Sequence, residues 1–331
     1  MTSINTPDKK LLADFEKASD SLIQLRAELA KAIFGQEDVV ELTLAAILGG
    51  GHGLLIGAPG LAKTKLTESL GQVLGLNEKR VQFPPDLMPA DILGSEVLEE
   101  AENGKRAFRF IEGPIFSQLL MADEINRASP RTQSALLQAM QEYQVSVAGS
   151  RHNLPRPFHV LATQNPIEQE GTYPLPEAQL DRFLLQIHVP YPDAATERRI
   201  LLATTGTQET KLKAVLSPTE LLNMQSLIRQ MPVGEKVVDA ILNLVRSARP
   251  GNGDRVVDAH VAWGPGPRAS QALMLAARAR ALLRGNLSPT LADVQALAKP
   301  ALSHRMALSY GARAEGIDLA SLIDRLTGDI A

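Results

Sequence analysis

The sequence predicts an α/β protein whose parallel-sheet core is followed by a domain built only of helices. Short apolar runs alternate with helical patterns in the first part of the chain, and a glycine-rich loop follows the first run. From about Leu216 onward the pattern is mainly helical and rich in Ala and Leu. Pro190 and Pro192 break the strand pattern before a Glu/Arg-rich helix, so we expect domains at 1–195 and 196–331.

The core is expected to contain five strands and two hairpins. The strands are the apolar runs at 54–56, 81–83, 119–121, 158–163 and 184–187. Asn103-Gly104 lies between two short strand patterns, which is typical of a hairpin turn. A second hairpin is expected around Gly149. Helical patterns cover 11–34, 35–48 and 64–76.

Composition excludes several classes of protein. The 331 residues include 34 Lys and Arg against 37 Asp and Glu, so the net charge of −3 gives no general attraction to nucleic acid. The absence of cysteine excludes disulfides and thiolate metal sites. The N-terminal sequence lacks a signal-peptide pattern, and the most apolar stretch, Leu42 to Ile56, is too short to span a bilayer. We expect a cytoplasmic protein without membrane insertion.

The most informative motif is a phosphate-binding loop (Walker A) between the first strand and the next helix. Backbone N–H groups of such a loop surround the phosphates of ATP, Lys63 reaches the β- and γ-phosphate oxygens, and Thr64 ligates Mg²⁺. Ala62 stands where the usual pattern has glycine, and we expect it to adopt ordinary helical dihedral angles. The nucleotide-binding residues are Gly57, Ala58, Pro59, Gly60, Leu61, Ala62, Lys63, Thr64 and Lys65.

An apolar strand about 60 residues further on ends in the paired carboxylates Asp123 and Glu124. After a phosphate-binding loop, this pair indicates ATP hydrolysis. Asp123 would hold the unit formed by Thr64 and Mg²⁺, and Glu124 would polarise the attacking water. Adjacent strand residues face opposite sides, so only the strand end lets both side chains reach one site.

Three further side chains are candidates for the nucleotide site. Asn165 follows a strand expected beside the phosphate loop and would orient the lytic water, although Asn-Pro is also common turn chemistry. Arg182 is a candidate for the arginine that a neighbouring subunit supplies to the γ-phosphate, the alternative being a surface ion pair. Arg268 stands in the first turn of a helix, where a cation is unfavourable unless a phosphate compensates. Arg127 is either a helix-end residue or a contact to a second subunit.

These motifs resemble the MoxR family of AAA+ ATPases, in the clade that has an insert in helix 2. The resemblance covers nearly the whole chain and is densest at 83–94, 110–116, 122–127 and 162–183. The family uses the same Ala-Lys-Thr ending of the phosphate loop. The sequence departs from the family pattern at Pro84 and at 264–266, where no side chain is needed for chemistry.

The resemblance implies roles for several residues. Asn165 would be sensor 1, Arg182 the arginine finger and Arg268 sensor 2. The hairpin at Asn103-Gly104 would be the insert in helix 2, and residues 33–36 would contact the adenine. The resemblance also implies a ring, typically hexameric, that acts as a chaperone in maturation, cofactor insertion or complex assembly, commonly on a partner with a von Willebrand factor A domain.

Two other functions remain open at this point. Related ATPases include helicases and the motor subunit of magnesium chelatase, but the first hairpin tip at 99–106 carries three acids and two bases, which suits a phosphate backbone poorly. A scaffold that binds ATP without hydrolysing it would have no use for Glu124. Glu168, Glu170 and Glu177 are subunit-contact or loop residues, and His304 and Arg305 suit a helix C-terminus and are expected to be structural.

Overall fold

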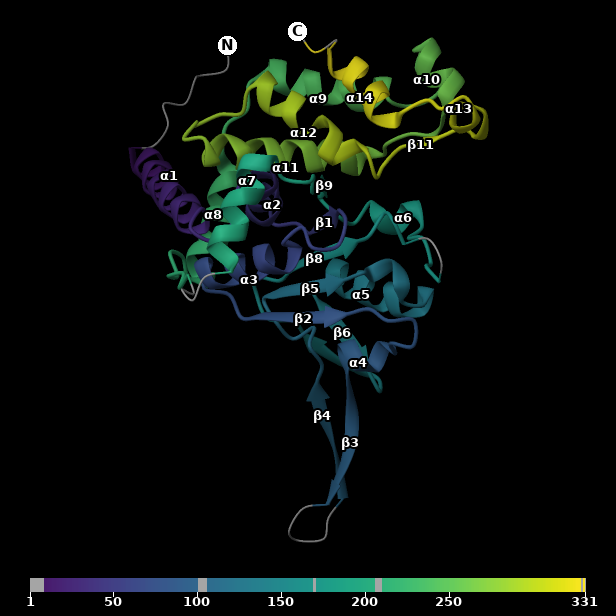
Figure 1. Ribbon diagram of the computed structural model, residues 1–331. Coiled ribbons are helices and arrows are strands. Elements are labelled where there is room, and N and C mark those ends of the chain that lie inside the picture. The colour runs from purple at the N-terminus through teal and green to yellow at the C-terminus, as the bar shows by residue number, and fades with distance from the viewer. Residues whose placement is uncertain (1–8, 101–105, 169–170, 206–209, 329, 331) are drawn as a thin grey trace.

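The computed structural model describes residues 9–100, 106–168, 171–205, 210–328 and 330 (Figure 1). A parallel sheet with helices on both faces lies at the centre. A layer of C-terminal helices lies at one end of the molecule, and the long β3–β4 hairpin projects from the opposite end (Figure 1).

The central sheet confirms the five predicted strands and their parallel arrangement. The strand order is β2-β5-β8-β1-β9, and every pairing between neighbours is parallel. From β1 the chain passes to β2, at the far edge of the sheet, and continues through β5 and β8. It then reaches β9 on the other side of β1, so β1 ends at the point where the strand order reverses. Ligands of open α/β sheets bind in such a crevice. The bounds are β1 Gly53–Ile56, β2 Glu78–Gln82, β5 Leu119–Asp123, β8 His159–Gln164 and β9 Leu185–His188.

Alternation along the strands builds two apolar clusters, one on each face of the sheet. Leu55 and Leu161 pack with α2 and α3 on one face, whereas Leu54 and Val160 pack with α5 on the other. The helices of this part are α1 Lys9–Leu29, α2 Glu37–Leu48, α3 Lys63–Val73, α4 Pro89–Leu93, a 3-10 turn at Ile125–Arg127, α5 Pro130–Glu142 and α6 Glu177–Leu180.

The C-terminal part is helical, as expected, and also contains a short antiparallel ribbon of β10 and β11. Ser217 and Thr290 begin α8 and α12 with capping boxes, which satisfy free N–H groups of the first turn. The bounds are α7 Ala194–Thr204, α8 Pro218–Gln230, α9 Glu235–Ser247, α10 Arg255–His260, β10 Val261–Trp263, α11 Pro267–Leu283, α12 Leu291–Leu302, β11 Ala307–Leu308, α13 Tyr310–Ala314 and α14 Leu319–Gly328.

Helix α2 joins the two parts. Its apolar face belongs to one cluster that runs from the sheet into α8, α9, α11 and α12. At its side, buried Arg280 of α11 donates to Glu41 of α2 at 2.8 Å and to Asp293 of α12 at 2.5 Å. Apolar packing is therefore continuous from the sheet into the C-terminal helices, and the boundary at 195/196 stays a prediction.

Both expected hairpins are present. The strands β3 Gly94–Glu100 and β4 Arg106–Glu112 form the long one, whose expected turn at Asn103-Gly104 lies outside the described residues. The strands β6 Gln144–Val147 and β7 Ser150–Asn153 form the short one. The two hairpins touch where the rings of Phe110 and His152 stack with centroids 3.8 Å apart.

Two buried histidines tie the sheet to its surroundings. His159 of β8 donates from Nδ1 to the Gly51 carbonyl at 2.8 Å and accepts at Nε2 from Gln225 of α8 at 3.0 Å. His52 accepts at Nδ1 from the Val160 N–H at 3.0 Å. These partners fit neutral imidazoles. Burial lowers the pKa of His52 to about 3 and that of His159 to about 4.

The low pKa values of these histidines predict a stability that falls with acidification. Below pH 6.5 the unfolded chain binds protons that the folded chain does not, so stability is present above 6.5 and is lost as pH falls toward 4. Between pH 7 and pH 5 each histidine should remove about 2 kcal/mol of unfolding free energy. In urea unfolding, His159→Gln should lose about 2 kcal/mol less than the wild type between pH 7 and pH 5. An unchanged loss in His159→Gln would contradict this.

Candidate nucleotide-binding site

The phosphate loop lies between β1 and α3, as predicted, but Ala62 does not adopt helical angles. It has φ +56° and ψ +21°, in the left-handed region, and Gly60 has φ +81°. The expectation for Ala62 was wrong because the chain must turn sharply just before α3 begins at Lys63. A left-handed residue other than glycine costs roughly 1–2 kcal/mol. The loop is anchored to the sheet, since the Gly57 N–H donates to the Gln164 carbonyl at 3.2 Å.

Lys63 is the first residue of α3, and its side chain reaches back to the loop. Its ammonium donates to the carbonyls of Gly57 at 2.5 Å and Ala58 at 2.9 Å. Burial lowers its pKa, whereas the charges of Asp123, Glu124 and Glu168 act in the opposite direction. The structure thus brings the loop and the predicted carboxylates together. Of the other loop residues, Thr64 is half-buried beside Lys63 and Lys65 is exposed.

A single buried hydroxyl joins the two carboxylate residues. Thr163, at the end of β8, donates to Asp123 Oδ1 at 2.6 Å and accepts from the Glu124 N–H at 2.9 Å. On the other side of β5, Arg80 of β2 donates to Asp123 Oδ2 at 2.5 Å, and Gln82 of β2 donates to Glu124 Oε2 at 2.7 Å. The Asp123 carboxylate is therefore held from both sides of β5, whereas Glu124 is held by its backbone on one side and by its carboxylate on the other.

The backbone of Glu124 carries strain. Its φ of +54° and ψ of +50° lie in the left-handed region, which is uncommon for residues other than glycine and is often found at functional sites. Its side chain also accepts from Arg127 at 2.8 Å, and Arg127 lies 3.8 Å from Glu168. Arg127 thus has carboxylate partners within its own chain.

The residues at the loop suit a magnesium ion held together with phosphate. Mg²⁺ prefers oxygen ligands and is usually bound by one or two protein groups and the phosphates of a substrate. The Thr64 hydroxyl and the Asp123 carboxylate are donors of this kind. Within the described residues, no group of three or more His, Cys, Asp or Glu side chains could hold a metal ion by itself. Phosphate oxygens would complete the coordination.

Asn165 follows β8, which lies between β5 and β1 in the sheet. Its side chain is buried, and Oδ1 accepts from the Ile167 N–H at 3.1 Å. That bond is turn chemistry, and it leaves the amide NH₂ for another partner. In the region expected to contact adenine, Gln36 is buried and donates to the Leu61 carbonyl at 3.1 Å, so it adjoins the phosphate loop.

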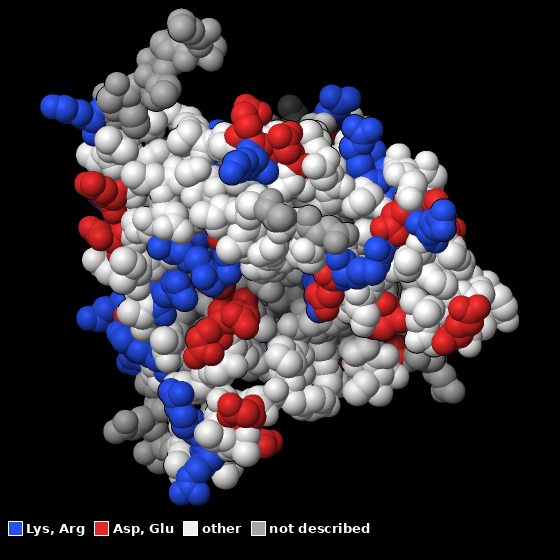
Figure 2. All heavy atoms as spheres, turned by 90° about the horizontal axis from the view of Figure 1, so that it is seen from above, with Lys and Arg blue, Asp and Glu red and all other residues white. Residues whose placement is uncertain are grey.

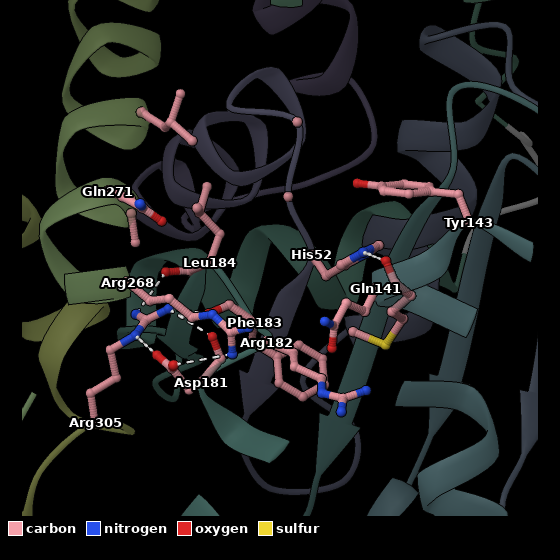
Figure 3. Close-up of a pocket in the computed structure, with 15 residues that line it drawn as sticks. His52, Gln141, Tyr143, Asp181, Arg182, Phe183, Leu184, Arg268, Gln271 and Arg305 are labelled. Atoms are coloured by element: carbon pink, nitrogen blue, oxygen red, sulfur yellow. Dashed lines mark hydrogen bonds and ion pairs between the residues drawn. The ribbon is translucent and has the colours of Figure 1, made fainter. Parts of the chain in front are cut away.

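Arg182 and Arg268 lie together in a second place. They line a pocket of about 240 Å³ with Asp181 and Arg305, and none of the lining residues belongs to the phosphate loop (Figure 3). Burial and the charge of Arg268 lower the pKa of Arg182, whose guanidinium donates to the Leu137 carbonyl. Arg268 lies 3.5 Å from Asp181. The predicted site residues therefore form two groups.

Sequence reasoning missed the neighbours that orient these groups. Arg80 and Gln82 belong to an edge strand whose register opposite β5 is not visible in the sequence. Thr163 lies in a polar run at the end of a strand, and this polarity was the only feature of the sequence that pointed to it. Of the ambiguous acids, Glu168 contributes to the field at Lys63, Glu177 is exposed in the first turn of α6, and Glu170 lies outside the described residues.

Comparison with known proteins agrees with this geometry. The pattern of the ATPase family associated with various cellular activities (AAA) matches residues 52–185, and that of the AAA lid domain matches 254–326. A crystal structure of a candidate ATPase from Cytophaga hutchinsonii superposes with a TM-score of 0.90 at 34% identity, covering 98% of both chains. The fold and site therefore define an AAA+ ATPase with its lid.

Two curated relatives narrow the class. The chain is 41% identical to Chaperone MoxR1 of Mycobacterium tuberculosis over 92% of its own length and 80% of that protein. It is 31% identical to Protein MoxR of Methylorubrum extorquens over 91% of both chains. The chain belongs to the MoxR family of AAA+ ATPases.

The position of Thr163 predicts a selective loss of ATP hydrolysis. Thr163→Val keeps the side-chain shape but removes the hydroxyl that orients Asp123 and the Glu124 backbone. Hydrolysis should fall about 10- to 100-fold, as for other residues that orient catalytic groups, while ATP affinity changes by less than about threefold. Thr43→Val is the matched control, because Thr43 is equally buried but bonds only to Val39 in its own helix. Equal rates in both variants would contradict the assigned role.

Proposed function

We propose that this protein is an ATP-driven chaperone in which each nucleotide is hydrolysed between two subunits. The observation that carries the proposal is the division of the site. One group lies at the carboxyl ends of β1 and β5 and consists of Lys63, Thr64, Asp123 and Glu124. The other group, Arg182 and Arg268, lines a pocket that contains no phosphate-loop residue. Phosphoryl transfer needs cations around the γ-phosphate as well as a loop that holds it. A neighbouring subunit is the natural source of these arginines.

The residues at the loop have distinct tasks in this reaction. The loop N–H groups and Lys63 hold the phosphates, and Mg²⁺ on Thr64 and Asp123 would neutralise charge on the β- and γ-phosphate oxygens. Glu124 polarises a water whose oxygen bonds to the γ-phosphorus as the bond to the bridging β–γ oxygen breaks. Asn165 orients that water, which transfers its proton to Glu124. Arg182 and Arg268 of the neighbour stabilise the charge on the transferred phosphoryl group.

A site of this kind implies a repeating assembly. An interface that joins different surfaces of identical subunits repeats from one subunit to the next, and it forms a ring where the rotation between subunits closes. We expect six subunits, as is typical of AAA+ rings. Hydrolysis would change the angle between the core at 1–195 and the lid at 196–331, which is a known type of switching motion.

The hairpins are the surfaces that we assign to the client. On the long hairpin Leu98 and Phe108 lie directly opposite each other, and Phe108 is 70% exposed. Such exposed apolar pairs on a projecting element suit a protein partner. A partner with a von Willebrand factor A domain, matured or loaded with a cofactor, is the expected client class.

Charge does not favour a nucleic acid. In β3 and β4, four glutamates accompany two arginines, and both arginines are paired, Arg106 with Glu100 at 3.2 Å and Arg109 with Glu99 at 3.1 Å. On the face seen from above, acidic and basic side chains lie side by side between large uncharged areas (Figure 2). A phosphate backbone is usually bound by a continuous basic surface. In the described part of the chain no helix is long and apolar enough to cross a membrane.

Client capture tests the proposed function. Glu124→Gln should bind ATP and stop before hydrolysis, so it should retain its client from native extract with ATP and lose it with ADP. Exposed Glu235→Gln is the control and should show no stable capture, because it turns ATP over. An ATP-dependent partner with a von Willebrand factor A domain would support the proposal. Recovery of nucleic acid or replication proteins without such a partner would contradict it.

A further inference from the structure

Arg305 is a buried arginine, away from the phosphate loop, that makes a full set of hydrogen bonds. It follows α12 in the lid and is only 2% exposed. Its Nε donates to Asp181 Oδ1 at 2.6 Å. Nη1 donates to the carbonyls of Ala301 at 2.6 Å and Leu184 at 3.2 Å, and Nη2 to those of Phe183 at 2.7 Å and Asp181 at 3.3 Å. All five N–H groups of the guanidinium are used.

Four of these five bonds reach one short segment, residues 181–184, which we call the finger segment because it contains Arg182. Arg305 contacts it before Arg182, at Asp181, and after Arg182, at Phe183 and Leu184. The adjacent His304 is also buried, and its Nε2 donates to the Phe183 carbonyl at 3.0 Å. Arg268, at the start of α11, approaches Asp181 from the same side (Figure 3). Three lid residues therefore hold the finger segment.

This arrangement differs from what a helix-end cation requires. A lysine or arginine that only complements a helix dipole stays solvated and binds carbonyls of its own helix. Arg305 makes one such bond, to Ala301, and directs its other four across the boundary between lid and core. Removing a guanidinium from water is costly unless all its donors are satisfied. The finger segment supplies that compensation, so its position is coupled to that of α12.

We infer that Arg305 is a positioning residue for Arg182, and that it makes the arginine finger move with the lid of its own subunit. A change of lid angle in one subunit then shifts the arginine offered to the nucleotide of the next subunit. This gives a route by which one ATP site influences its neighbour. The inference rests on the proposed function, in which Arg182 acts on a neighbouring nucleotide.

A double-mutant cycle on assembled protein tests the inference. Arg305→Lys keeps the charge beside Asp181, but its compact ammonium cannot reach all the carbonyls that the planar guanidinium joins. Hydrolysis should fall about 10- to 100-fold, as for small misplacements of a catalytic group, while the Kd for ATP stays within about threefold. In an Arg182→Ala background, Arg305→Lys should cause no further loss of kcat, because both changes remove the same contribution.

Arg280→Lys is the matched control. Arg280 is also a buried lid arginine, but it bonds to Glu41 and Asp293 and not to the finger segment. The Arg280→Lys variant should lower the melting temperature. It should leave kcat within about twofold of its parent, whether the parent is the wild type or Arg182→Ala. If Arg305→Lys is unstable, Asp181→Asn replaces it in the double-mutant cycle with Arg182→Ala. This substitution weakens the same contact at nearly constant side-chain volume.

The outcomes separate this inference from the proposed function. A normal kcat in Arg182→Ala would show that Arg182 is no finger, and the proposed function would fail. A low kcat in Arg182→Ala, with the further loss from Arg305→Lys fully additive, would overturn the positioning role alone. Loss of ATP binding in Arg305→Lys would also overturn it, since a positioning residue for the neighbour's site should not affect the subunit's own phosphate loop.

Discussion

The hydroxyl of Thr163 is the contact on which the geometry of the proposed catalytic carboxylates depends. It joins the end of β8 to Asp123 and to the backbone of Glu124, where the chain leaves β5 in a left-handed conformation. A strained residue keeps its conformation only when its surroundings hold it there. The parallel pairing of β8 with both β5 and β1 places this contact beside the phosphate loop, so sheet topology and chemistry are linked directly.

The same kind of buried polar contact recurs between core and lid. Arg280 joins α2 to α11 and α12, and Arg305 joins α12 to the finger segment. Both lie within or beside one continuous apolar cluster, where an unpaired charge would be strongly unfavourable. These contacts therefore fix how the lid meets the core. In the proposed ring, they would extend the influence of the lid through Arg182 toward the adjoining subunit.

The sequence allowed the strands, the phosphate loop and the carboxylate pair to be predicted because each depends on local pattern. Strand ends and residue spacing are visible in the chain, whereas strand register is not, so Arg80 and Gln82 were missed. Ala62 was misjudged because its dihedral angles follow from the turn that the sheet and α3 impose. The contacts of Arg305 with the finger segment were missed because those partners lie more than a hundred residues away, whereas the residues next to Arg305 indicate only the end of a helix.

The central claim is that two subunits build each ATP site, and subunit complementation tests it most directly. Lys63→Ala and Arg182→Ala should each keep only a small fraction of wild-type activity alone, because one lacks the loop lysine and the other the finger. In a random equal mixture, about half of the subunits have an intact loop and about half have an intact finger. About a quarter of the interfaces therefore join the two, and about a quarter of wild-type activity should return. Mixed rings that assemble, as native mass spectrometry would show, yet stay as inactive as either variant would contradict the account.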